Sequence, residues 1–259
     1  MKNSDLTGLQ EIPITPEAMQ LLLANIPKDM ILVGGQALAF WLEHFGIDPM
    51  LGRHDSAFIS MDADLLGKRE HVRALADAVS GVANYPPRQA MTILSGQIFL
   101  VNRNDGTYMN IDVIHRIGNM SSNDVRRRSV EASVQGVPFR VMHPLDVLVS
   151  RLENFRGIRD KQNELGLRQV RLAIAVAGEF VAEAAGRDEG IATRAVEVIA
   201  SAARSAAGIY ARKHGAEVYD AIRPVRLAKL ISDPNFRAVR LPRLSEESRA
   251  ARQRATKVR

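Results

Sequence analysis

Cysteine is absent from this chain of 259 residues. Its absence excludes disulfide bonds, thiolate metal ligands and a cysteine nucleophile, and it fits a reducing compartment. The chain also lacks an apolar run long enough to cross a bilayer, and the first ten residues contain no apolar core of the signal-peptide type. We therefore expect a soluble, cytoplasmic protein without a membrane partner.

The composition is that of an ordinary globular protein. Hydrophobic residues make up 46% and charged residues 25% of the chain, which suits one large domain or two small ones. The net charge is +6 and the isoelectric point is near 9.9. This positive excess suits a polyanionic partner such as RNA, but many basic proteins bind no nucleic acid, so charge alone leaves the partner open.

The most informative segment begins with an apolar run of strand length, residues 30–33, which stops at Gly34 and Gly35. An amphipathic helical pattern follows, and a second apolar run covers residues 58–66. The pattern predicts a strand, a glycine turn, a helix and a second strand. Glycine has no Cβ, so the backbone here can approach a ligand closely, and the free N–H groups at the start of the helix favour an anion.

Three aspartates are candidate metal ligands. Asp62 and Asp64 lie two residues apart in the second apolar run, so a strand would place both side chains on one face. Only a cation or a proton relieves the repulsion between carboxylates held so closely, and a hard ion such as Mg2+ suits these ligands. Asp112 is a lone acid in an apolar strand predicted over residues 107–117, where its burial is costly unless it is paired with a cation or exposed in a cleft. An Asp-Gly pair before this strand predicts a hairpin with another strand over residues 91–101.

The order of these features resembles the nucleotidyltransferase superfamily typified by DNA polymerase beta. Within it, V-G-G-Q-A-L-A-F and S-M-D-A-D-L are most similar to the toxin-type, AbiEii-like branch. Members of that branch tend to read G-G-(S/T)-A-L and S-T-x-D-(I/F)-D-L. The resemblance covers the first half of the chain well and the second half loosely.

The resemblance implies a site for a nucleoside triphosphate and two Mg2+ ions, with Mn2+ as the alternative metal. Asp62, Asp64 and Asp112 would be the catalytic residues and would hold both ions. In the same family, a helix of the form L-x-x-x-K-L and an R-D-K run carry basic residues that face the cleft, and Arg151 stands here at the position of the lysine. The nucleotide-binding residues implied in this way are Gly34, Gly35, Gln36, Arg151 and Lys161.

The predicted fold class is α+β: a nucleotidyltransferase-type mixed β-sheet flanked by helices, followed by a C-terminal helical bundle. We expect a nucleotidyltransferase domain over residues 1–142, a helical domain over residues 143–236 and a basic tail over residues 237–259. The tail is rich in arginine. Two interpretations of it stay open: a mobile arm that binds a polyanion, or a helix that packs on a partner.

The expected activity is the transfer of a nucleoside monophosphate from an NTP to a hydroxyl group. The acceptor would be an RNA 3′ end such as that of tRNA, or a Ser, Thr or Tyr of a protein, and the toxin-type relatives imply a toxin with a cognate antitoxin. Gln36 replaces the serine or threonine of the family and Arg151 its lysine, which would suit a catalytically degenerate module that binds RNA or protein. A further alternative is a nuclease or phosphohydrolase that uses the same acids with water as the nucleophile.

Overall fold

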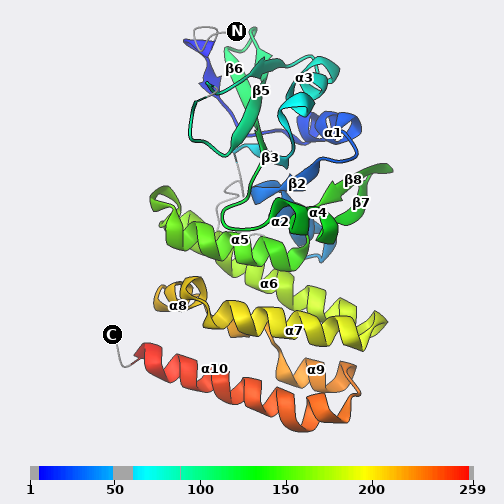
Figure 1. Ribbon diagram of the computed structural model, residues 1–259, viewed down its shortest axis with the longest axis vertical. Coiled ribbons are helices and arrows are strands. Elements are labelled where there is room, and N and C mark those ends of the chain that lie inside the picture. Colours follow the sequence, from blue (N-terminus) through cyan, green and yellow to red (C-terminus); the bar gives the residue numbers. More distant parts are fainter. Residues whose placement is uncertain (1–5, 49–60, 88, 257–259) are drawn as a thin grey trace. The chain divides into compact units, whose positions relative to one another are not determined.

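The computed structural model describes residues 6–48, 61–87 and 89–256 (Figure 1). The fold class is α+β, as predicted, because a mixed sheet of eight strands flanked by helices precedes a helical C-terminal region. Within the described ranges, no helix is both long enough and apolar enough to cross a membrane.

The chain divides into two compact units. The sheet unit contains Met1–Phe40 and Gly52–His143, and the helical unit contains Trp41–Leu51 and Pro144–Arg259. The sheet unit ends at His143, one residue after the domain boundary predicted at residue 142. Trp41–Leu51, which the domain prediction included in the first domain, belongs to the helical unit.

The sheet unit is organised around one mixed sheet, whose strands follow the order β4-β5-β6-β3-β2-β8-β7, with β1 paired to β6. The central strand β3 runs parallel to β6 and antiparallel to β2, and β2 runs parallel to β8. The strands are β1 (Gln10–Glu11), β2 (Ile31–Val33), β3 (Ala63–Leu66), β4 (Val82–Asn84), β5 (Leu94–Asn102), β6 (Thr107–Ile114), β7 (Val130–Val134) and β8 (Val137–Val141). The helices of this part of the chain are α1 (Pro16–Asn25), α2 (Gly34–His44), α3 (Arg69–Ala78) and α4 (Ser122–Arg128).

Apolar patterning explains the core of the sheet unit. All three residues of β2 are buried, and so are the three apolar residues of β3, which leaves Asp64 as the one polar residue of that strand. Helix α1 begins at its cap Thr15, whose Oγ1 accepts a hydrogen bond of 3.2 Å from the N–H of Ala18, and it packs against β8. Helix α3 has an apolar stripe of helical period and packs against β5. Buried strands and amphipathic helices therefore hold β3 and its acid in place.

The helical unit is a set of packed helices (Figure 1). Helix α6 contacts α5, α7 and α9. The buried face of α7 consists mostly of alanine, whose small side chain lets neighbouring backbones approach closely. The elements are α5 (Pro144–Gly157), η2 (Arg159–Lys161), α6 (Glu164–Arg187), α7 (Glu189–Arg204), α8 (Ala206–Lys213), η3 (Val218–Ala221), α9 (Pro224–Leu230), η4 (Phe236–Arg240) and α10 (Leu241–Thr256).

The segment predicted as a basic tail over residues 237–259 is helical up to Thr256. It forms most of the single π-helical turn η4 and all of α10. Leu241 and Leu244 are buried, and α10 packs against α8 and α9 of its own chain. Helix α10 thus packs within its own chain, and contact of this segment with a polyanion or a partner stays a prediction. Residues 257–259 lie outside the described ranges.

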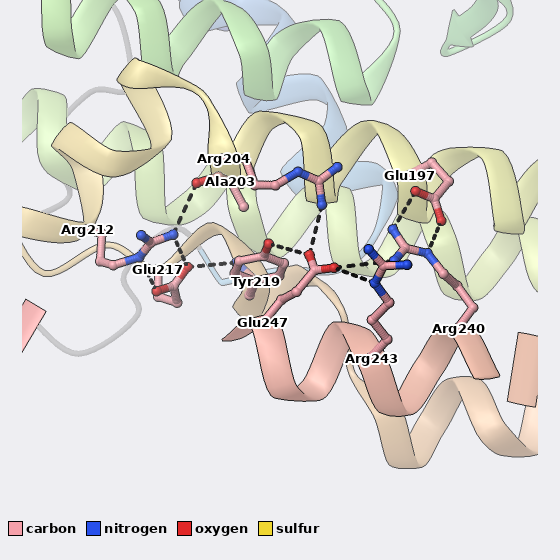
Figure 2. Close-up of polar contacts among 9 residues, drawn as sticks. All are labelled: Glu197, Ala203, Arg204, Arg212, Glu217, Tyr219, Arg240, Arg243 and Glu247. Carbon is pink, nitrogen blue, oxygen red and sulfur yellow. Dashed lines mark hydrogen bonds and ion pairs between the residues drawn. The ribbon is translucent and has the colours of Figure 1, made fainter. Parts of the chain in front are cut away.

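The carboxylate of Glu247 on α10 gathers four cationic or hydroxyl partners (Figure 2). Arg204 Nη1 and the Tyr219 hydroxyl donate hydrogen bonds of 2.8 and 3.0 Å to it, and ion pairs join it to Arg240 and Arg243 at 3.5 and 3.4 Å. Burial alone would raise the pKa of the Glu247 carboxyl, but the hydrogen bonds from Tyr219 and Arg204 outweigh it and lower the pKa below the ordinary value. One acid therefore ties α10 to α7 and η3.

Replacing Glu247 with glutamine is expected to lower the free energy of unfolding by about 1–3 kcal/mol, because donors that faced a carboxylate would face an amide. A carboxyl whose pKa is lowered by folding contributes stability above its unfolded pKa and loses it as the pH falls through its folded pKa. The difference between wild type and Glu247→Gln should thus shrink in acid, as denaturant titrations at several pH values would measure. Glu246→Gln, at the exposed neighbouring position, is the matched control and should change the unfolding free energy by less than about 0.5 kcal/mol. Equal losses in both variants would contradict this role for Glu247.

Candidate metal centre

Strand pairing brings the three predicted acids together. In the parallel pair of β3 and β6, Asp64 and Asp112 are register partners, so their side chains lie side by side on one face of the sheet. Asp62 lies in a bend immediately before β3 rather than within the strand. Each of the three residues offers one carboxylate oxygen, and these oxygens lie within 4.8 Å of one another. Residues 58–60 of the predicted strand lie outside the described ranges.

This arrangement can hold a metal ion. Three half-buried carboxylates at such distances repel one another, and a divalent cation relieves that repulsion more completely than water does. Carboxylate oxygens are hard ligands of the kind that Mg2+ and Mn2+ prefer. The donor set therefore fits the metal that the sequence predicts.

Gly34 lies against the acids because it follows β2, whose last residue Val33 is the register partner of Asp64. Its backbone has φ of +65°, a conformation that favours glycine. A Cβ atom at this position would lie 1.9 Å from Asp64 Oδ2 and 2.7 Å from its Cγ. The carboxylate of Asp64 thus occupies the space that a side chain at residue 34 would need.

Gly35 and Gln36 continue from Gly34 into the first turn of α2, so all three predicted nucleotide contacts of this motif lie at the same edge of the sheet. Gly35 is buried and Gln36 is half-buried. The early N–H groups of α2 therefore begin next to the acidic cluster, as a site for a phosphate beside a metal requires.

Asp112 sits in a mixed environment of burial and hydrogen bonds. Gln97 Nε2 and Asn110 Nδ2 both donate to Asp112 Oδ1, at 2.9 and 3.0 Å. Burial raises the pKa of the Asp112 carboxyl, the two amide donors oppose this, and the negative charge of Asp62 adds to the increase, so the net shift is upward. Our sequence prediction did not include either amide. The signal for Asn110 was its position two residues before Asp112 on one strand, which places both on the same face.

His143 is a third residue that the sequence prediction did not include. The N–H of Met142 donates to the carbonyl of Leu32 at 2.9 Å, so the parallel strands β2 and β8 end at the same edge, one followed by Gly34 and the other by Met142 and His143. Burial, helped by the charge of Arg128, lowers the pKa of the His143 imidazole to about 4. The ring is therefore neutral at physiological pH.

Arg151 and Lys161, the predicted triphosphate contacts from the second half of the chain, belong to the helical unit. Arg151 is buried on α5, where its Nη1 donates to Gln169 Oε1 at 3.2 Å. Lys161 is exposed at the end of η2. Neither belongs to the acidic cluster of the sheet unit, and their contact with a triphosphate stays a prediction.

No family model matches the chain, and no curated protein matches it. Among solved structures it is similar to JHP933 from Helicobacter pylori, with 13% sequence identity over 99% of this chain and 95% of that chain. The TM-score of this match is 0.40, which is too low to carry an argument about fold or function. The chemistry of the site is therefore inferred from its own geometry.

Proposed function

We propose that this protein is a metal-dependent nucleotidyltransferase that transfers a nucleoside monophosphate from an NTP to a hydroxyl group. The observation that carries the proposal is the convergence of Asp62, Asp64 and Asp112 within 4.8 Å, with the backbone of Gly34 packed against Asp64. A metal site adjoining a glycine turn and a helix start places hard ligands next to N–H groups. A triphosphate with its metal has the complementary chemistry.

The residues would divide the reaction among them. The acceptor oxygen forms a bond to the α-phosphorus, the bond between that phosphorus and the bridging oxygen breaks, and pyrophosphate leaves. Asp62 and Asp64 would hold the metal. When bound, the metal would neutralise phosphate charge and lower the pKa of the acceptor hydroxyl. Asp112 would be the third ligand and would receive the hydroxyl proton, directly or through the metal. The first N–H groups of α2 would hold the phosphates.

An RNA acceptor, such as the 3′ end of a tRNA, is favoured by the distribution of charge. Residues 144–259 contain 22 Lys and Arg against 14 Asp and Glu, whereas residues 1–143 contain 13 against 15. The positive excess is therefore confined to the second half of the chain, where it would attract a polyanion. A toxic activity, a cognate antitoxin and a cytoplasmic location belong to the same proposal and rest on the family resemblance and composition alone.

The test is incubation of the full chain with each α-labelled NTP, Mg2+ and either total RNA or cell protein. We expect label on RNA with Mg2+ and none with EDTA. RNA whose 3′ diol has been oxidised with periodate is the matched control and should stay unlabelled. Label on protein would change the acceptor class, and monophosphate released without a labelled acceptor would indicate a phosphohydrolase. Absence of label together with absence of NTP binding would overturn the proposal and favour the degenerate binding module.

A further inference from the structure

Four polar side chains form one row across the sheet, from the edge strand β4 to the central strand β3. Asn84 is the register partner of Gln97, Gln97 that of Asp112, and Asp112 that of Asp64. Side chains of register partners lie on the same face of a sheet, so the row leads directly into the acidic cluster. The cluster therefore has an ordered polar neighbourhood on the side of β5 and β4.

The hydrogen bonds along this row all point toward the acid. Asn84 Nδ2 donates to Gln97 Oε1 at 3.3 Å, and Gln97 Nε2 donates to Asp112 Oδ1 at 2.9 Å. An amide has a donor end and an acceptor end, so the contact from Asn84 selects the orientation in which Gln97 presents N–H to the carboxylate. With the Gln97 amide reversed, its oxygen would face the Asp112 carboxylate and its N–H group would face the Asn84 amide nitrogen.

Asn110 completes the arrangement from β6 itself. The residue is only 9% exposed, and its Nδ2 donates to the same oxygen, Asp112 Oδ1, at 3.0 Å. Two N–H donors therefore converge on Oδ1. A carboxylate oxygen with two such donors is a poor further ligand, so the other oxygen, Oδ2, is the better ligand for a cation held with Asp62 and Asp64.

We propose that Asn84, Gln97 and Asn110 are positioning residues, an amide relay that holds Asp112 by Oδ1 and makes it a ligand through Oδ2 alone. The inference rests on the proposed metal function of the same site and goes beyond it by assigning the coordination mode to three neutral residues. Asn84 touches no acid of the cluster and acts only through Gln97. Partners that hold metal ligands in this way typically change metal affinity about 10- to 100-fold when removed.

The test measures the affinity of the full chain for Mn2+ alone, by titration calorimetry or by the electron paramagnetic resonance of free Mn2+, at one neutral pH. Gln97→Met removes the central donor at nearly constant volume and is expected to weaken binding about 10- to 100-fold. Asn84→Asp tests the direction of the change in affinity, because simple charge attraction and the amide relay predict opposite changes. A carboxylate added near a cation site strengthens binding by Coulomb attraction. A carboxylate at residue 84, however, can only accept hydrogen bonds, so it would accept one from Gln97 Nε2. The Gln97 amide would then turn its Oε1 toward Asp112 and no longer donate to it. We therefore expect Mn2+ binding to be about tenfold weaker.

Asn104→Asp, in the exposed turn between β5 and β6, adds the same charge outside the row and should leave the affinity unchanged. If the wild type binds no Mn2+, the proposed function fails. If the wild type binds and Asn84→Asp binds equally or more tightly, the relay is overturned while the metal site stands. Gln97→Met decides the question should Asn84→Asp not fold, as circular dichroism would reveal.

Discussion

Asp112→Asn is expected to lower nucleotidyl transfer at least about 100- to 1,000-fold without destabilising the metal-free protein. A metal ion in such a site contributes several kcal/mol of charge stabilisation in the transition state, and about 1.4 kcal/mol corresponds to a factor of ten in rate. The substitution removes one of three carboxylates from the cluster and also the candidate base. Gel-based transfer of label, with wild type and variant at equal concentration, measures the loss.

Stability should change in the opposite direction. Burial and the charge of Asp62 raise the pKa of Asp112, so the ionised carboxylate is less favourable in the folded state than in the unfolded chain. Such a group contributes stability below its unfolded pKa and loses this contribution as the pH rises through its folded pKa. At neutral pH and without metal, Asp112→Asn should thus melt at the same temperature as the wild type or higher. The difference should shrink in acid, where Asp112 is protonated.

Metal should reverse this order, because an ion that binds only the folded wild type raises its melting temperature by mass action. Asp105→Asn, in the exposed hairpin turn, is the matched control and should leave both activity and the response to Mg2+ unchanged. An Asp112→Asn protein with wild-type activity would exclude Asp112 from the chemistry. An inactive variant that also melts well below the wild type would show a structural role instead.

The sheet shows which strand pairings a local sequence pattern can predict. The Asp-Gly turn predicted the hairpin, which the structure forms from β5 and β6. The pairing nearest the turn joins Asn102 to Thr107, and counting back along both strands places Gln97 opposite Asp112. The hairpin was therefore predicted but its register was not, because the predicted strand ends at residues 101 and 107 would place Gln97 opposite Ile111. The position of Asn84 depends on the longer connection from β4 to β5, and a longer connection leaves the register open.

The convergence of the acids depended on a different kind of information. Alternation along a strand relates Asp62 to Asp64, but nothing local relates Asp64 to Asp112, which are partners only because β6 lies beside β3. The family resemblance predicted their convergence, because it assigns all three acids to one metal site. Asp62 lies in a bend, and its carboxylate nevertheless stays with the other two.

The C-terminal segment shows where composition fails. The excess of arginine over acids in residues 237–259 predicted a tail. The charge balance of a segment includes only its own residues and ignores acids elsewhere in the chain. In the structure, Arg240 pairs with Glu197, 43 residues away, and Arg252 pairs with Asp220, 32 residues away. Acids on other helices thus neutralise arginines that appear unbalanced in the sequence, and these partners are invisible until the helices are packed.

Gly34→Ala is expected to abolish Mn2+ binding and to lower the free energy of unfolding by about 3 kcal/mol. A positive φ costs an alanine about 1–2 kcal/mol, and overpacking adds a cost of similar size. The added Cβ would lie 1.9 Å from Asp64 Oδ2, so the carboxylate must leave the cluster. Calorimetric Mn2+ titration and denaturant unfolding measure the two effects.

Gly106 separates the cost of backbone strain from the cost of overpacking. It has the same φ of +65°, but no atom lies within 4 Å of an added Cβ. Gly106→Ala should therefore show the cost of strain alone, with normal Mn2+ binding. In a background of Asp64→Gly, which removes the three atoms nearest the new Cβ, Gly34→Ala should cost no more than Gly106→Ala costs in the wild type. A double-mutant cycle isolates the difference as the contact between residues 34 and 64. If Gly34→Ala costs the same with and without the Asp64 side chain, the glycine serves the turn alone. If the cost falls to that of Gly106→Ala when the side chain is removed, residue 34 is also glycine because the Asp64 carboxylate occupies the space beside it.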